Sequence, residues 1–217
     1  MRAWFLLGVL AAATACGKLL EDDTAVSPDG GGGTVDASSS DAASGDASTD
    51  GASVDAPSDV APEKRLVFLT SAIFQGDFGS DWDTKCQTAA LGAGLGGKWL
   101  AWVSTSAGRA ADRIVLDVEY RTVDGRLVAS GRADLLSGDI ATPIDRTETD
   151  GGLGGTPYVW TGTAADGGLA TPTCQDWSMN VDGTNGTVGD ARTADAHWTN
   201  DVAPMCSIYA HLYCFQQ

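Results

Sequence analysis

The stretch DTKCQTAALGAGLGGKWLAWVS (83–104) decides the fold, because a helix signal and a strand signal follow each other within it. Ser80 stands three residues before Asp83, which nearly matches the capping box that begins many helices. Apolar side chains then recur on one helical face, at Trp82, Cys86, Ala89 and Ala90. We therefore expect a helix that begins near Ser80, ends before Gly92 and buries Cys86.

The glycine-rich run after this helix, residues 92–97, raises the question of a nucleotide site. A phosphate-binding fingerprint links a strand to a following helix, whereas these glycines follow a helix, so we interpret them as a helix end and a turn. Residues 98–105 then alternate around Trp99, Ala101 and Val103, which predicts a strand with a buried face.

The rest of the domain consists of short strand signals separated by polar loops. Asp124-Gly125 lies between two β-rich runs and predicts a hairpin. Further strands are expected at 64–71, 158–163 and 211–215, and a second short helix at 108–114. This order predicts an α+β domain with two helices, short antiparallel strands and long loops.

The N-terminal residues indicate export and lipidation. Residues 3–15 are an apolar run of signal-peptide length, too short for the ~20 residues that span a bilayer. Cys16 follows small residues directly and resembles the lipidated Cys of bacterial lipoproteins. The alternative is an ordinary secretory signal with an incidental Cys. We predict a signal peptide at 1–15 and an anchor at Cys16, which would attach the chain to the outer membrane or cell surface of a bacterium.

Residues 16–62 predict a disordered acidic linker. The segment after Cys16 carries ten acidic residues against one Lys and almost no large apolar side chain, so it cannot offset the entropy of ordering. Its regularly spaced Asp residues could suggest calcium, but Ca²⁺ needs six to eight converging oxygens. The segment is interpreted as a solvated stalk that joins the membrane to a domain at 63–217.

The charge of residues 63–217 argues against one class of partner. This part of the chain has nineteen acidic and eleven basic residues, with no Lys/Arg cluster to contact phosphates. Nucleic-acid binding is therefore not expected.

Four cysteines remain in the domain, at positions 86, 174, 206 and 214. In an exported protein an even number indicates disulfides, and four cysteines allow three pairings. Zinc is the alternative, but the spacings lack a CxxC pattern and His197 and His211 are the chain's two histidines.

The order of these cysteines and several stretches resemble known proteins. An early helix Cys, a Cys in the last strand and an internal pair around an oxygen-rich loop are similar to C-type-lectin-like domains. The closer resemblance is to a bacterial family of lipoprotein domains of unknown function, related to the lectin-like and endostatin-like folds. The matching stretches are 68–79, 83–104, 110–114, 159–167, 174–177 and 212–217. The resemblance implies a lectin-like fold with disulfides Cys86–Cys214 and Cys174–Cys206.

The same resemblance suggests a calcium site. Sugar-binding C-type lectins hold calcium with a Glu/Gln-Pro-Asn/Asp tripeptide and a Trp-Asn-Asp run; this chain lacks the tripeptide and has Trp198-Thr199-Asn200-Asp201. Oxygen-bearing side chains of the type that Ca²⁺ prefers occur between the middle cysteines. The candidate calcium ligands are Asp176, Asp182, Asn200 and Asp201. The alternative is that Asn and Asp are turn formers there. No other cofactor is expected.

The leading functional prediction is non-catalytic recognition of an extracellular protein or glycan by the loops around 174–206. Trp160, Trp177 and Trp198 could stack on a sugar ring, and the alternative, which we favour, is that they pack in the core. If any of them faces solvent, Trp177 and Trp198 are the candidate ligand-binding aromatics, together with Asn200 and Asp201. One alternative is a structural envelope lipoprotein without a specific ligand. Another is an exported hydrolase that uses His197 beside Asp195, although the chain contains no Gly-x-Ser-x-Gly or His-Glu-x-x-His motif.

Overall fold

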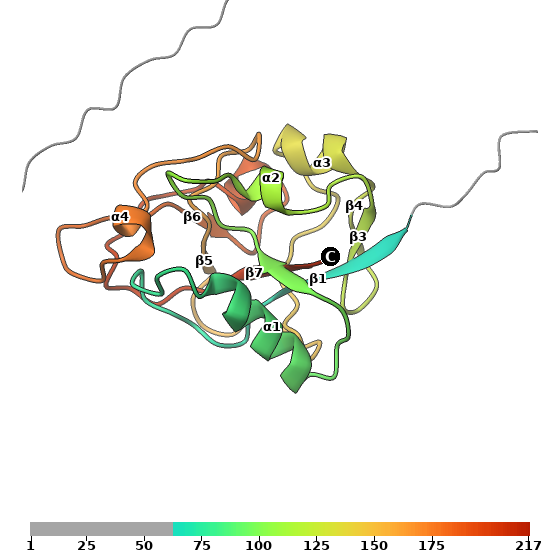
Figure 1. Cartoon of the computed structure of the whole chain (residues 1–217). Helices are drawn as coiled ribbons and strands as arrows, with labels where there is room; N and C mark the ends of the chain where they lie inside the picture. Colours follow the sequence, from blue (N-terminus) through green and yellow to red (C-terminus); the bar gives the residue numbers. More distant parts are fainter. Residues whose placement is uncertain (1–62) are drawn as a thin grey trace, which may run out of the picture. The chain divides into compact units, whose positions relative to one another are not determined.

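A computed structural model describes residues 63–217 (Figure 1). The predicted signal peptide at 1–15, the lipidated Cys16 and the linker up to residue 62 lie outside the described residues. Within residues 63–217, none of the helices has the length and apolar character that a membrane crossing requires. These residues form a mixed α/β domain.

A five-stranded sheet forms one half of the domain. Its strands are β1 (Lys64–Leu69), β2 (Trp99–Ala101), β3 (Glu119–Thr122), β4 (Leu127–Ala129) and β7 (Tyr213–Gln216), in the order β2-β7-β1-β3-β4. β7 is the last strand in the chain, yet it lies between β1 and β2. The sheet therefore joins the two ends of the domain through direct backbone pairing.

One pair of strands differs from the expected antiparallel arrangement. β1 runs antiparallel to β7 but parallel to β3, with Arg65 opposite Tyr120. Parallel neighbours need a long crossover connection, and here the chain passes through a helix, β2 and a second short helix between β1 and β3. The prediction of antiparallel strands is therefore wrong for this pair. The β3–β4 hairpin is confirmed, and Gly125 in its turn has a positive φ of 88°.

Helix α1 (Trp82–Gly92) occupies the predicted stretch, but its first turn differs from the capping prediction. Asp81, rather than Ser80, is the residue before the helix, and its side chain makes no capping hydrogen bond. The Asp83 carboxylate instead accepts a hydrogen bond from Ala101 N (2.9 Å) and pairs with Arg113 (2.6 Å). Asp83 thus connects α1 to β2. Because its carboxylate binds these distant partners, it does not cap the first turn of the helix.

The number of helices is larger than predicted. Besides α1 and α2 (Ala110–Arg113), the structure contains α3 (Arg132–Ser137) and α4 (Cys174–Trp177). Both additional helices are only one or two turns long, and α4 has left-handed backbone angles, so neither shows a helical repeat in the sequence. The prediction of two helices is therefore wrong.

The sheet is buried on both faces, because alternate residues of its strands belong to different apolar clusters. Val67 and Phe215 pack with residues of α2 and α3, whereas Phe68 and Cys214 pack with residues of α1. Figure 1 shows the corresponding layers, with α1 on one side of the sheet and α2 and α3 on the other. Two layers of apolar side chains thus enclose the central strands.

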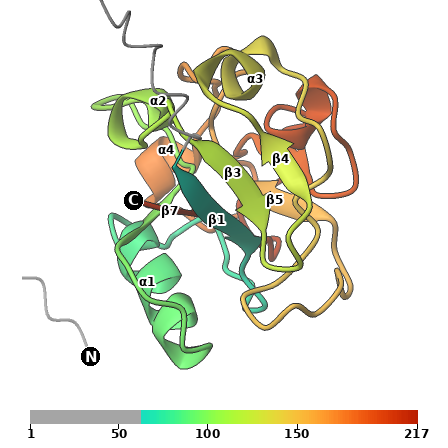
Figure 2. The same cartoon turned by 90° about the vertical axis from the view of Figure 1, so that its right-hand side faces the viewer.

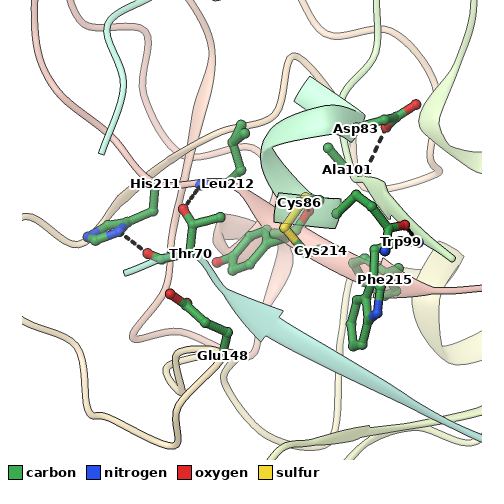
Figure 3. Close-up of a disulfide and its surroundings, with 12 residues drawn as sticks. Thr70, Asp83, Cys86, Trp99, Ala101, Glu148, His211, Leu212, Cys214 and Phe215 are labelled. Carbon is green, nitrogen blue, oxygen red and sulfur yellow. Dashed lines mark hydrogen bonds between the residues drawn. A yellow bond between two sulfur atoms is a disulfide. The ribbon is translucent and has the colours of Figure 1, made fainter. Parts of the chain in front are cut away.

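Both disulfides form in the pairing that the family resemblance implies. Cys86–Cys214 joins α1 to β7, with a Cα–Cα distance of 5.4 Å (Figure 3). Cys174–Cys206 joins α4 to the segment before β7, with a Cα–Cα distance of 5.7 Å. The cysteines of the domain are therefore structural, and the zinc alternative does not apply to them.

Candidate functional site

The predicted recognition loops lie in a part of the domain with little regular structure. Its elements are β5 (Tyr158–Trp160), α4, β6 (Val188–Asp190) and the 3₁₀ turn η1 (Ala196–Trp198). β5 and β6 form a separate two-stranded sheet. Around Cys206, Gly76 N donates to its carbonyl and its own N–H donates to Thr184 O, both at 2.8 Å. The second disulfide thus holds three loops together.

Helix α4 is a left-handed turn. Cys174, Gln175, Asp176 and Trp177 all have positive φ, between 52° and 63°. This conformation costs roughly 1–2 kcal/mol per residue outside glycine. It persists because its ends are fixed: Cys174 by the disulfide and Trp177 by burial and a hydrogen bond to Ser104 O (3.0 Å).

The two candidate ligand-binding tryptophans, Trp177 and Trp198, are both fully buried. The Trp177 ring stacks on Phe78 with a centroid distance of 5.0 Å. Trp198 packs against Trp102 and Tyr213, with centroid distances of 5.3 and 5.6 Å. Both rings therefore pack in the core, the alternative to exposure, and neither is a surface platform for a ligand, since each belongs to one of the two large buried clusters of the domain.

The predicted calcium ligands do not come together. The Asp176 carboxylate accepts hydrogen bonds from the backbone N–H and hydroxyl of Ser106, which lower its pKa. The Asp182 carboxylate accepts from the Ser207 hydroxyl at 2.7 Å. Within residues 63–217, no three side chains among His, Cys, Asp and Glu converge on a metal-sized site. Asp176, Asp182 and Asp201 therefore do not form the predicted site.

Asn200 and Asp201 use their backbone in the local fold. Asn200 N donates to Ala196 O at 3.2 Å, and Asp201 N donates to Val188 O at 2.8 Å. The Asn200 side chain is exposed and that of Asp201 is partly exposed. Both residues remain available at the surface, but they end a 3₁₀ turn rather than complete a cation site.

The exposed apolar side chains on the loops around the second disulfide include Ile73, Val181, Met205 and Tyr209, each between 43% and 54% exposed. We call this surface the loop face. Its three segments are cross-linked by side chains: Gln75 Nε2 donates to Ser207 O (2.8 Å), and Asn180 Nδ2 donates to the Asp77 carboxylate (2.8 Å). The apolar groups are therefore held in a fixed arrangement.

The surroundings of the loop face are acidic. Residues 170–217 contain a single Lys or Arg, Arg192. Its guanidinium binds Asp190 at 2.5 Å and, by hydrogen bonding, holds the pKa of that carboxyl below its usual range. By contrast, the Asp77 and Asp182 carboxylates have the neutral partners Asn180 and Ser207. The loop face therefore presents apolar groups within a negative potential.

The His197–Asp195 pair lies in solvent. The His197 Nδ1 and an Asp195 carboxylate oxygen are 3.0 Å apart, and both side chains are more than half exposed. The hydrogen bond with His197 lowers the pKa of Asp195. An exposed pair of this kind orients the imidazole but does not shield a reacting group from water.

Sequence reasoning missed a groove that lies beside α1. A groove of about 400 Å³ is lined by Thr70, Ala72, Phe74, Asp81, Thr84, Lys85, Thr88, Ala89 and Glu148. It lies between the end of β1, one face of α1 and the loop that contains Glu148. Glu148 stands alone in a Thr- and Asp-rich loop, so nothing local in the sequence marks it as a site residue.

The comparisons with known proteins give no family assignment: neither a protein-family model nor a curated protein matches the chain. The resemblance to bacterial lipoprotein domains thus remains a prediction from the sequence stretches.

Proposed function

We propose that this chain is an exported lipoprotein, anchored to the bacterial envelope through Cys16, whose C-type-lectin-like domain binds an extracellular protein through the loop face. The lectin-like assignment is supported by the nesting of the two disulfides. Cys86–Cys214 ties the first helix to the last strand, and Cys174–Cys206 closes the long loop within it. The anchor is supported by the N-terminal sequence pattern.

The positions of the two ends of the domain support an orientation in which the loop face points away from the membrane. β1 begins at Lys64 and runs antiparallel to β7, which ends at Gln216, so the domain begins and ends at the same side. The start of β1 and the C-terminus lie at the far end of the domain from α4 (Figure 1) and face the viewer after the 90° turn (Figure 2). A tether attached at residue 63 leaves the loop face directed away from the membrane.

The apolar loop face is the observation that carries the proposal. Isolated exposed apolar residues need no explanation, but four such groups on three cross-linked loops are typical of an interaction surface. A protein fits better than a glycan, because sugar binding uses broad aromatic faces. The tryptophans at 99, 102, 160, 177 and 198 are all buried, which leaves Tyr209 as the exposed ring of the loop face.

The charge of the loop face indicates the chemistry of its partner. Because Asp77 and Asp182 have no cationic partner within the described residues, a partner segment that combines apolar side chains with Lys or Arg is favoured. Binding of this kind weakens as ionic strength rises, since exposed charges are screened within about 8 Å at physiological salt.

The proposal is tested by selecting binders from a random peptide display library on the purified full chain. We expect enriched peptides that contain apolar and basic residues and whose affinity falls at least about tenfold for Met205→Asp and for Tyr209→Asp. Leu91→Asp is the matched control, because Leu91 is 65% exposed but lies on α1, outside the loop face. Equal binding to all three variants, or enrichment of acidic peptides, would contradict the proposal.

A further inference from the structure

The groove beside α1 has a rigid polar floor. The Thr70 hydroxyl donates to Ala72 O (2.8 Å) and accepts from Leu212 N (2.9 Å), and its carbonyl oxygen lies 2.6 Å from His211 Nδ1. Figure 3 shows Thr70 between His211 and Glu148, with its hydrogen bonds to the strand that leads into β7. The hydrogen-bonding groups of Thr70 are thus used internally, and Thr70 fixes the shape of the groove.

Glu148 supplies a buried negative charge to this groove. It is 8% exposed, and its two carboxylate oxygens accept hydrogen bonds from the N–H (2.8 Å) and hydroxyl of Ser71. Within residues 63–217 the carboxylate forms no ion pair. A carboxylate offers about four acceptor positions, so half of them remain for a ligand. Burial of an uncompensated charge is costly, which favours a cationic group at this place.

Lys85, on α1, supplies a positive charge to the lining. Its ammonium nitrogen lies 4.7 Å from the centroid of the Phe74 ring, a cation–π contact that holds it at the groove. Lys85 does not bridge to Glu148, because the two groups are not within ion-pair distance. Apolar atoms of Ala72, Phe74 and Ala89 lie in the same lining. The groove is therefore lined by one ammonium group, Lys85, by two carboxylates, the buried Glu148 and the exposed Asp81, and by apolar atoms.

We propose that this groove binds a small amino-acid-like zwitterion, with its ammonium group on Glu148, its carboxylate on Lys85 and its hydrocarbon part on Ala72, Phe74 and Ala89. The volume lies within the range of ~300–1,000 Å³ that is typical of small-molecule sites. Each charged end of such a ligand replaces its water shell with one fixed counter-charge of the protein.

Other ligand classes fit less well. A sugar requires several converging hydrogen-bond donors and acceptors, but the lining contains no amide side chain, and its side-chain donors are Lys85 and threonine hydroxyls. A simple anion would meet the carboxylates of Glu148 and Asp81. A divalent metal ion requires more oxygen ligands than these two carboxylates provide. The groove adjoins the loop face at residues 72–74 but shares no lining residue with its four apolar side chains, so the two proposals are tested by different variants.

The test measures binding of ω-amino acids of increasing length to the purified full chain by calorimetry, from glycine through γ-aminobutyrate to ε-aminocaproate. We expect saturable one-to-one binding that is strongest at one chain length. Butylamine and butyrate, each with one of the two charges, are expected to bind at least about tenfold more weakly. This comparison uses the unmodified protein and does not depend on the folding of any variant.

Two variants test which protein side chain binds each charged end of the ligand. Glu148→Gln and Lys85→Met should each weaken binding of the best ligand at least about tenfold. The matched controls are Asp150→Asn and Lys98→Met, which remove exposed charges outside the groove; Asn tolerates the positive φ of 60° at position 150. The proposal is wrong if no member of the series binds up to ~10 mM, if butylamine binds as well as the zwitterions, or if the controls lose as much affinity as the groove variants.

Discussion

The sheet region (residues 63–129 and 212–217) and the loop region (residues 158–211) are both fully packed, but different interactions maintain them. In the sheet region, paired backbone groups of five strands provide the framework. In the loop region, β5 and β6 contribute only three residues each, and the other backbone hydrogen bonds belong to turns, loops and isolated bridges. A buried core therefore does not require extensive regular structure when side chains fix the loops.

Tryptophan side chains hold several segments of the loop region in place. Trp160 Nε1 donates to Phe74 O (2.8 Å), and Trp177 Nε1 donates to Ser104 O (3.0 Å). In each case an indole of the loop region satisfies a carbonyl of a segment that follows a sheet strand. These bonds combine apolar burial with a defined direction, which aliphatic side chains cannot do.

The largest expected effect concerns the disulfide of the sheet region. Replacing Cys86 and Cys214 together by Ala opens a loop of 128 residues and should lower the free energy of unfolding by ~5 kcal/mol. The same change at Cys174 and Cys206, which close 32 residues, should cost ~4 kcal/mol. Urea unfolding followed by tryptophan fluorescence measures both.

The relative size of these two losses is the informative quantity. If the Cys174–Cys206 variant is the less stable of the two, chain entropy does not decide the outcome. The loop region then depends on its disulfide more strongly than the sheet region does, because it has fewer backbone ladders to retain its structure.

A smaller loss is expected from added volume in the loop region. A Cβ at Gly189 would lie 1.9 Å from Trp198 O, so Gly189→Ala forces β6 and η1 apart and should cost about 3 kcal/mol. The matched change in the sheet region is Gly92→Ala at the end of α1, where nothing lies within 4 Å of the added Cβ. It should be neutral or stabilising by up to ~1 kcal/mol. Thermal unfolding of both variants compares the two regions; an equal loss in both would remove the distinction between them.

The smallest effect concerns a charge in the β3–β4 hairpin of the sheet region. Burial raises the pKa of Asp124, but the hydrogen bonds from Thr122 and Arg126 outweigh it and lower the pKa from 3.8 to about 2. A lowered pKa in the folded state stabilises the protein above the unfolded value of 3.8, and this contribution is lost as pH falls through about 2. Because solvent screens the partly exposed group, we expect Asp124→Asn to cost only ~1 kcal/mol at pH 7.

The pH dependence distinguishes this charge effect from a packing effect. The difference between the Asp124→Asn variant and the unchanged protein should disappear near pH 2 in urea unfolding. Asp117→Asn is the control, because Asp117 is 79% exposed and lies 3.5 Å from Arg132, and it should show no measurable difference. A difference that stays constant with pH at position 124 would mean that shape, not charge, is responsible.

The sheet region follows from the sequence to a large extent. Periodicity placed α1 and β2, a short apolar run placed β1, and Asp124-Gly125 placed the hairpin turn. The parallel β1–β3 pair could not be predicted, because pairing direction depends on the connection that the chain takes in space rather than on residue pattern.

The loop region and the candidate sites follow from the sequence only in part. The family resemblance implied the disulfide that closes residues 174–206, but the sequence did not decide between burial and exposure of Trp177 and Trp198, since their burial depends on glycines such as Gly189 that allow close backbone approach. The groove depends on a contact between Ser71 and Glu148, which are 77 residues apart. No local pattern reports such a contact.

The position of β7 between β2 and β1 limits when the sheet can be completed during synthesis. β7 pairs with both β1 and β2, and it carries Cys214. Until residues 213–216 have left the ribosome, β1 and β2 have no strand between them and Cys86 has no partner. β1, β3 and β4 can pair with one another earlier, but β2 joins the sheet only through β7. The sheet and its disulfide are therefore completed in a late step, after the last strand has been made.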